Sequence, residues 1–152
     1  MQKMTLMIVD DEERFLETTR KLLEKKGFQV VTAGNGSEAM KMLYSREVHV
    51  VILDVKMPGK DGNTILREIK QLFPLVEVIM LTGHATVDSA IDGLKSGAAD
   101  YLTKPADIEE LIRKAEDAYE KRLRQEEKIR LAQSKQIMKS PREILKDSTG
   151  EG

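Results

Sequence analysis

At 152 residues, the chain has room for one domain and an additional segment, and its 40% hydrophobic content is enough for a core. A formal net charge of −1 argues against general affinity for nucleic acid or an anionic membrane, and the absence of cysteine excludes disulfides and thiolate metal sites. The apolar run near the start is too short for a signal peptide or a membrane span, so we expect a cytoplasmic protein with no membrane contact.

Short apolar runs alternate with amphipathic segments before residue 122. The runs predict five strands, over residues 5–9, 29–33, 48–55, 77–81 and 100–103. Helices are predicted after them, over residues 12–26 and 37–46, before Pro74, over residues 86–96 and after a capping Asp107. This alternation indicates a doubly wound α/β domain with a parallel sheet, whose most apolar strand, 48–55, is expected at the centre.

Helical spacing also predicts which side chains face the core. The expected inward residues are Phe15, Thr19, Leu22 and Leu23, then Ile65, Leu66, Ile69 and Leu72, then Val87, Ala90, Ile91 and Leu94, and finally Ile108, Leu111, Ile112, Ala115, Ala118 and Tyr119. After residue 122 charge dominates, the apolar stripe is thin and Pro141 interrupts any helix. We therefore expect a domain over residues 1–122 and a charged helical tail or linker over residues 123–152, disordered from Lys146.

Polar groups stand at the ends of the predicted strands. Asp10 and Asp11 end the first strand, Asp54 the third and Thr82 the fourth, and Lys104 follows the fifth. Ligands of doubly wound sheets bind outside the carboxyl ends of the strands, at the topological switch point. If the strands are parallel, these groups gather at one edge of the sheet and make a metal-dependent phosphoryl-accepting site.

The three aspartates indicate a divalent cation. Converging carboxylates raise one another's pKa, and a cation removes that conflict. Oxygen ligands with open water positions suit Mg²⁺ beside a phosphate. Helix capping is the alternative for Asp10 and Asp11, because a helix is predicted from Glu12, and one of the two could cap while the other binds metal.

Asp54 is harder to explain as a structural residue, because a carboxylate that closes the most apolar strand is costly to bury without a partner. An aspartate can attack phosphorus and form an acyl phosphate. The charge on the phosphoryl oxygens would be met by the metal, the Lys104 ammonium and the Thr82 hydroxyl. A lone lysine at a strand end is usually a solvated charge and a lone threonine a strand former, so their joint placement supports the inference.

Three further features lie near the predicted site: a turn, a bond that precedes a proline, and a tyrosine. Met57–Pro58–Gly59 predicts a tight turn that sets the Lys56 carbonyl near the site. The Lys104–Pro105 bond is either the commoner trans form or a cis bond that aims the lysine. Tyr101 is either an edge-strand aromatic packed on a helix or a rotamer switch.

Four segments resemble the receiver domain of two-component response regulators. They are residues 8–12 (IVDDE), 53–62 (LDVKMPGKDG), 81–84 (LTGH) and 100–105 (DYLTKP). The resemblance covers residues 4–122 and implies a flavodoxin-like five-stranded parallel sheet of order 2-1-3-4-5 with five flanking helices. The sequence of residues 81–87 is most similar to that of receivers of enhancer-binding transcriptional activators.

The resemblance implies a role for each residue of the site. Asp54 is the phosphoacceptor, which makes the chain a phosphoprotein. Asp11 and Asp54 bind Mg²⁺ directly with the Lys56 backbone carbonyl, whereas Asp10 acts mainly through water. Lys104, which pairs with the phosphoryl group, is catalytic together with Asp54 and Thr82. Thr82 and Tyr101 form the switch: Thr82 moves to hydrogen-bond the phosphoryl group, and Tyr101 turns inward.

Partners follow from the same resemblance. The expected phosphoryl donor is a sensor histidine kinase or a small acyl phosphate, and the expected targets are a downstream output domain or protein and a homodimer through the fourth helix, fifth strand and fifth helix. Catalysis would be limited to transfer onto Asp54 and slow hydrolysis from it, so a signalling switch is expected rather than an enzyme. The chain is either a stand-alone receiver or a part of a larger regulator, with no direct contact to nucleic acid.

Two other functions fit the sequence less well. A phosphatase of the haloacid dehalogenase type places a second aspartate two residues after its nucleophile, where this chain has Lys56. A flavodoxin-like FMN protein needs a loop rich in serine, threonine and glycine after its first strand. Here that loop is Asp10–Glu13, which repels a phosphate unless metal is present.

Overall fold

The computed structural model describes residues 4–56, 59, 61–83 and 87–138. The elements are β1 Thr5–Val9, α1 Glu13–Lys25, β2 Gln29–Ala33, α2 Gly36–Ser45, β3 Val50–Asp54, α3 Gly62–Leu72, β4 Glu77–Thr82, α4 Val87–Lys95, β5 Asp100–Thr103 and α5 Ile108–Met138. Every predicted element is present. The predicted turn residues Met57 and Pro58, the helix break at Pro141 and the disorder from Lys146 lie outside the described residues.

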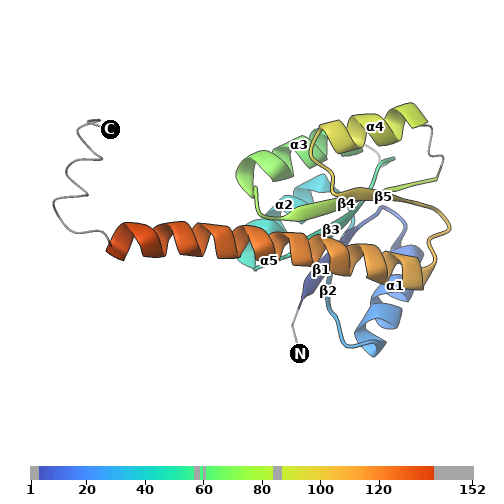
Figure 1. Ribbon diagram of the computed structural model, residues 1–152. Coiled ribbons are helices and arrows are strands. Elements are labelled where there is room, and N and C mark those ends of the chain that lie inside the picture. Colours follow the sequence, from blue (N-terminus) through green and yellow to red (C-terminus); the bar gives the residue numbers. More distant parts are fainter. Residues whose placement is uncertain (1–3, 57–58, 60, 84–86, 139–152) are drawn as a thin grey trace. The chain divides into compact units, whose positions relative to one another are not determined.

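The five strands form one parallel sheet in the order β2-β1-β3-β4-β5 (Figure 1). β3 lies at the centre, as its apolar sequence predicted, and all of its residues are buried. Val9 pairs with Leu53 across β1 and β3, and Asp54 pairs with Leu81 across β3 and β4. The flavodoxin-like fold and its strand order are therefore confirmed.

Two apolar clusters cover the two faces of the sheet, because successive side chains of a strand point to opposite sides. One cluster joins the sheet to α2 and α3 through residues such as Leu43 and Leu66. The other joins it to α1 and α5 through residues such as Leu23 and Leu111. Figure 1 shows α1 and α5 on one face, with α2, α3 and α4 on the other.

The connection after β3 is held close to the strand end. Val55 N–H donates to the Leu81 carbonyl at 2.8 Å, and Gly62 N–H donates to the Val55 carbonyl at 3.0 Å. A Cβ atom at Gly62 would lie 2.7 Å from the Val55 Cα atom, so only glycine allows this approach. Asp61 then caps α3 by accepting from the Thr64 N–H at 3.0 Å. The loop that follows Asp54 is thus anchored on both sides.

Of the inward residues predicted for α1, Thr19 and Leu23 are confirmed and Leu22 was wrong, and the prediction missed Leu16. Leu16, Thr19 and Leu23 are buried, whereas Leu22 is 43% exposed and Phe15 is half-buried. Only the narrow stripe of residues three and four apart reaches the sheet. Leu22 lies at the margin of that stripe and lines an open groove beside Ala106.

Further predicted core residues of α3 and α4 are exposed. Leu72 is 52% exposed in the last turn of α3, and Ile91 and Leu94 are 42% and 44% exposed in α4. α4 lies next to β5, the edge strand, where the sheet offers less surface to cover an apolar face. The predicted side chains of Val87 and Ala90 lie outside the described set.

The chain contains two compact units, residues 1–122 and residues 123–152. In the first, Leu111 and Ala115 of α5 are buried, and the Arg122 guanidinium donates to the Val48 carbonyl at 2.8 Å. In the second, side chains such as Ile129 and Leu131 are exposed. None of the described helices has the length and apolar character needed to span a membrane.

Candidate functional site

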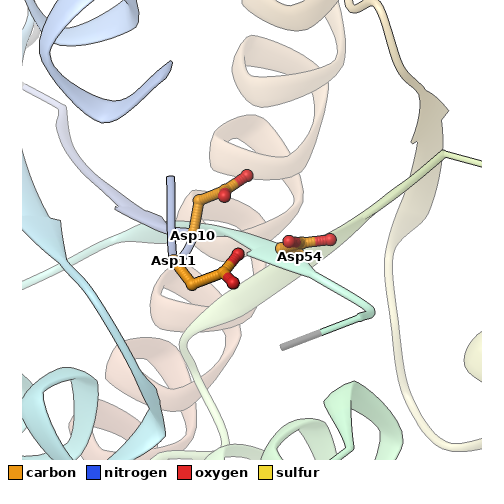
Figure 2. Close-up of side chains that lie close together, drawn as sticks. All are labelled: Asp10, Asp11 and Asp54. Carbon is orange, nitrogen blue, oxygen red and sulfur yellow. The ribbon is translucent and has the colours of Figure 1, made fainter. Parts of the chain in front are cut away.

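Three aspartates meet at the carboxyl edge of the sheet. Asp10 and Asp11 follow β1, and Asp54 ends the neighbouring β3 (Figure 2). One carboxylate oxygen from each lies within 4.8 Å of those of the other two, a spacing that allows the three to share one cation. Asp10 and Asp54 are buried and Asp11 is exposed, so the cluster opens to solvent on the Asp11 side.

Backbone amides fix one oxygen of each buried aspartate. The Oδ1 atom of Asp10 accepts from the Glu12 N–H at 2.9 Å, just before α1 begins. The Oδ1 atom of Asp54 accepts from the Lys56 N–H at 3.2 Å. Asp10 therefore fixes the backbone just before α1 and keeps its second oxygen for another partner. It is not the helix cap that we weighed against metal binding, because the N-cap residue is Glu12 and α1 has no side-chain capping hydrogen bond. The hydrogen bond from Lys56 also places that residue beside Asp54.

Lys104 supplies the positive charge at this edge. Its Nζ atom lies 2.7 Å from Asp10 Oδ2, 3.5 Å from Glu12 Oε1 and 3.7 Å from Asp54 Oδ2. Asp10 Oδ2 accepts no hydrogen bond of good geometry from the described residues, so the Lys104 contact is an ion pair. The Lys104–Pro105 peptide bond is cis. Lys104 therefore contacts the Oδ2 atoms of Asp10 and Asp54, whereas their Oδ1 atoms accept hydrogen bonds from backbone N–H groups.

The charges at the site are only partly balanced. Burial raises the pKa of Asp54, and the nearby Asp10 carboxylate raises it further. The Lys56 N–H and the Lys104 ammonium lower it without cancelling the rise. Burial lowers the pKa of Lys104, but the Asp10, Asp54 and Glu12 carboxylates outweigh burial and leave it above its ordinary value. Negative charge is therefore in excess, and a cation would relieve it.

Thr82 and Tyr101 lie on the neighbouring strands β4 and β5. Thr82 is buried at the end of β4, one residue past the pairing of Leu81 with Asp54. Lys104 N–H donates to the Thr82 carbonyl at 2.7 Å, which ties the end of β5 to the same point. Thr82 and the half-buried Tyr101 both line a cavity of about 20 Å³.

Two contacts to Lys104 were not predicted from the sequence. Glu12 approaches it as described above, and the Phe15 ring lies with its centroid 4.8 Å from Lys104 Nζ. Helical spacing placed Phe15 inward, but it gave no sign that the ring would face a lysine 89 positions later. The meeting depends on how α1 and the end of β5 pack.

Comparisons with known proteins place the chain in a family. The model of the response regulator receiver domain matches residues 6–116. The DNA-binding transcriptional regulator NtrC of Escherichia coli K12 is 36% identical over 118 residues, which is 78% of this chain and 25% of NtrC. The chain thus spans about a quarter of the length of this curated relative.

Solved structures agree with the family match. A response regulator receiver domain protein from Clostridium thermocellum has a TM-score of 0.73 at 38% identity, covering 78% of this chain and 95% of that one. NtrX from Brucella abortus in complex with ADP has a TM-score of 0.80 at 30% identity, covering 86% of this chain and 30% of that one.

The chain therefore belongs to the response regulator receiver domain family. Receivers of this family are phosphoryl-accepting signalling switches rather than conventional enzymes. The similarity to NtrC and NtrX is consistent with the enhancer-binding subgroup that the sequence indicated.

The raised pKa of Asp54 predicts a gain in stability when its charge is removed. A carboxyl group whose folded-state pKa is raised costs stability when ionised; the cost is full above the raised pKa and vanishes below the ordinary value of 3.8. In metal-free buffer at neutral pH, Asp54→Asn should therefore raise the free energy of unfolding, by an amount on the order of 1 kcal/mol typical of single substitutions. The gain should shrink as the pH falls toward 4.

Urea unfolding followed by circular dichroism measures this difference. The matched control is Asp61→Asn, at an exposed helix cap where asparagine caps as well as aspartate. Its free energy of unfolding should stay near that of the parent chain at neutral pH. A loss of stability in Asp54→Asn at neutral pH would contradict the charge balance described above.

Proposed function

We propose that residues 4–122 form a receiver that takes a phosphoryl group onto Asp54 in a Mg²⁺-dependent reaction, with a sensor histidine kinase as donor. The observation that carries the proposal is the convergence of three carboxylates with Lys104 at the end of β1 and β3. A structural role explains Asp10, which holds the start of α1. It does not explain a third, strand-ending carboxylate whose burial raises its pKa.

The donor set suits a hard divalent cation. Asp11 and Asp54 each offer a carboxylate oxygen to the cluster, which opens to solvent beside Asp11. Lys56, whose carbonyl is the third proposed ligand, is held next to Asp54 by its own N–H. Asp10 has one oxygen on the Glu12 N–H and the other on Lys104, which favours a role for it through water. All-oxygen ligands with room for water match Mg²⁺. When bound, the ion would neutralise the carboxylates and the phosphoryl oxygens.

Asp54 is proposed as the nucleophile and Lys104 as its charge partner. The Oδ1 atom of Asp54 is held by the Lys56 N–H, so Oδ2, which faces Lys104, is the oxygen that attacks. A new oxygen–phosphorus bond forms as the bond from phosphorus to the donor's leaving group breaks. Lys104 pairs with the transferred phosphoryl oxygens, and the Thr82 hydroxyl donates to them. Slow hydrolysis completes the cycle: water attacks the phosphorus, the bond from phosphorus to Asp54 Oδ2 breaks, and inorganic phosphate leaves as the carboxylate is restored.

Phosphorylation is proposed to act through Thr82 and Tyr101. The phosphoryl group adds about −1.5 to −2 charges beside Thr82. The cavity that both residues line, about 20 Å³, is close to the space of one water and far too small for a phenol ring. We propose that Thr82 moves toward the phosphoryl group and that Tyr101 turns inward into the space that Thr82 leaves. The surface changed by this exchange is formed by α4, β5 and α5.

The remaining assignments extend this switch. We infer a domain over residues 1–122 that serves a downstream output domain or protein, and a linker role for the charged tail over residues 123–152. NtrC is about four times as long as the part that matches this chain, which supports an output region outside this chain. We place the protein in the cytoplasm and assign it no membrane or direct nucleic-acid contact.

Acetyl phosphate tests the phosphoryl site without a kinase. Incubated with acetyl phosphate and Mg²⁺, the chain should gain the mass of one phosphoryl group, because Asp54 is activated by the cation and by Lys104. Intact mass spectrometry measures the adduct. It should be absent with EDTA and in Asp54→Asn, while Asp61→Asn, the exposed cap, should react like the parent chain.

A parent chain that gains no adduct and also fails to bind beryllium fluoride, a phosphoryl mimic, would overturn the proposal. An adduct that persists in Asp54→Asn would move the acceptor to another residue.

Dimerisation through α4, β5 and α5 is tested by light scattering. The parent chain with Mg²⁺ should shift from the mass of one chain toward that of two when beryllium fluoride is added, because the mimic drives the Thr82 and Tyr101 exchange. Asp54→Asn should keep one mass in both conditions. An unchanged mass for the parent chain, with and without the mimic, contradicts the proposed dimer.

A further inference from the structure

Lys104 has two kinds of neighbour. On one side are the carboxylates of Asp10, Glu12 and Asp54, at 2.7, 3.5 and 3.7 Å. The other kind is aromatic: the centroid of the Phe15 ring lies 4.8 Å from the Lys104 Nζ atom. This is within the range at which an ammonium is attracted to the face of an aromatic ring.

The two kinds of contact differ in what they do to an incoming phosphoryl group. A carboxylate neutralises the ammonium and competes with a phosphoryl oxygen for it. An aromatic ring attracts the ammonium through its quadrupole without adding a net negative charge. The attraction is also weakly directional, so the ammonium can move toward Asp54 while remaining over the ring. Phe15 can therefore hold Lys104 at the site and leave its charge available.

Phe15 is itself held in place by the site. It lies in the first turn of α1, whose approach is fixed by the hydrogen bond from the Glu12 N–H to Asp10. The ring is half-buried and packs against the apolar cluster between the sheet, α1 and α5. The side chain of Lys104 keeps 21% of its surface exposed, so without the ring it would have more freedom to turn to solvent.

We propose that Phe15 is a positioning residue for the receiver reaction: its ring face holds the Lys104 ammonium between the aspartates and the incoming phosphoryl group. This inference rests on the proposed role of Lys104 in phosphoryl binding and extends it to a residue of α1. Phe15 touches neither the phosphoryl group nor the metal ligands in this account. It acts through Lys104 alone.

The test measures the affinity of the full chain for beryllium fluoride in Mg²⁺ by isothermal titration calorimetry. Phe15→Leu keeps an apolar side chain but removes the ring, so affinity should fall roughly two- to tenfold, the range expected for one ammonium–ring contact. Phe15→Tyr keeps the ring and should bind close to the parent chain. Leu22→Ala, about two helical turns beyond Phe15 in the same helix, is the matched control and should not weaken binding.

A double-mutant cycle separates positioning from a general structural effect. In a Lys104→Ala background, Phe15→Leu should have no further effect on affinity, because the contact that it removes is already gone. Equal losses in both backgrounds would overturn the inference. So would an unchanged affinity in Phe15→Leu when the parent chain binds normally.

A second measurement needs no substitution and keeps the inference testable if Phe15→Leu does not fold. Protons over an aromatic face are shifted upfield, so the Lys104 methylene protons next to Nζ should resonate upfield of those of the exposed Lys21. Ordinary lysine shifts at Lys104 would overturn the inference. Failure of the parent chain to bind beryllium fluoride would instead remove the proposed function on which the inference rests.

Discussion

Electrostatic repulsion among three carboxylates at the end of two neighbouring strands is the constraint on which the rest of the site depends. The parallel order β2-β1-β3-β4-β5 brings Asp10, Asp11 and Asp54 to one edge, and two of them are buried. One lysine, Lys104, reaches two of the three, and the pKa of Asp54 remains raised despite it. The site is thus short of positive charge, and a divalent cation would relieve that shortage and so allow an anionic phosphoryl group to approach.

The same edge explains how a local charge could reach a distant surface. The ends of β3, β4 and β5 are joined by backbone hydrogen bonds, from Val55 to Leu81 and from Lys104 to Thr82. A phosphoryl group that draws on Lys104 and Thr82 therefore acts on two strands at once. Thr82 and Tyr101 line the same small cavity, so the proposed switch would make the position of one depend on that of the other. This is the kind of two-state element that a charge change can bias.

Most of this arrangement could be predicted from the sequence because it depends on periodicity and strand ends. Alternating runs gave the strands, and their last residues gave the aspartates, Thr82 and Lys104. The predictions were wrong where the packing of helices on the sheet decides burial. Leu22 was predicted to be buried but is exposed, whereas Leu16, which was not predicted, is buried. It also gave no reason to expect the Phe15 ring beside Lys104, a contact between segments far apart in the chain.

Magnesium titration of stability tests the central claim most directly. The free energy of unfolding of the parent chain, measured by urea denaturation, should rise with Mg²⁺ concentration, as it must for a ligand that binds only the folded state. Asp54→Asn lacks one carboxylate, so its free energy of unfolding should rise much less with Mg²⁺. The variant is expected to be the more stable of the two without metal, and Mg²⁺ should narrow or reverse that difference. Two results would contradict this: a free energy of unfolding of the parent chain that does not change with Mg²⁺, or an equal increase in the parent chain and in Asp54→Asn.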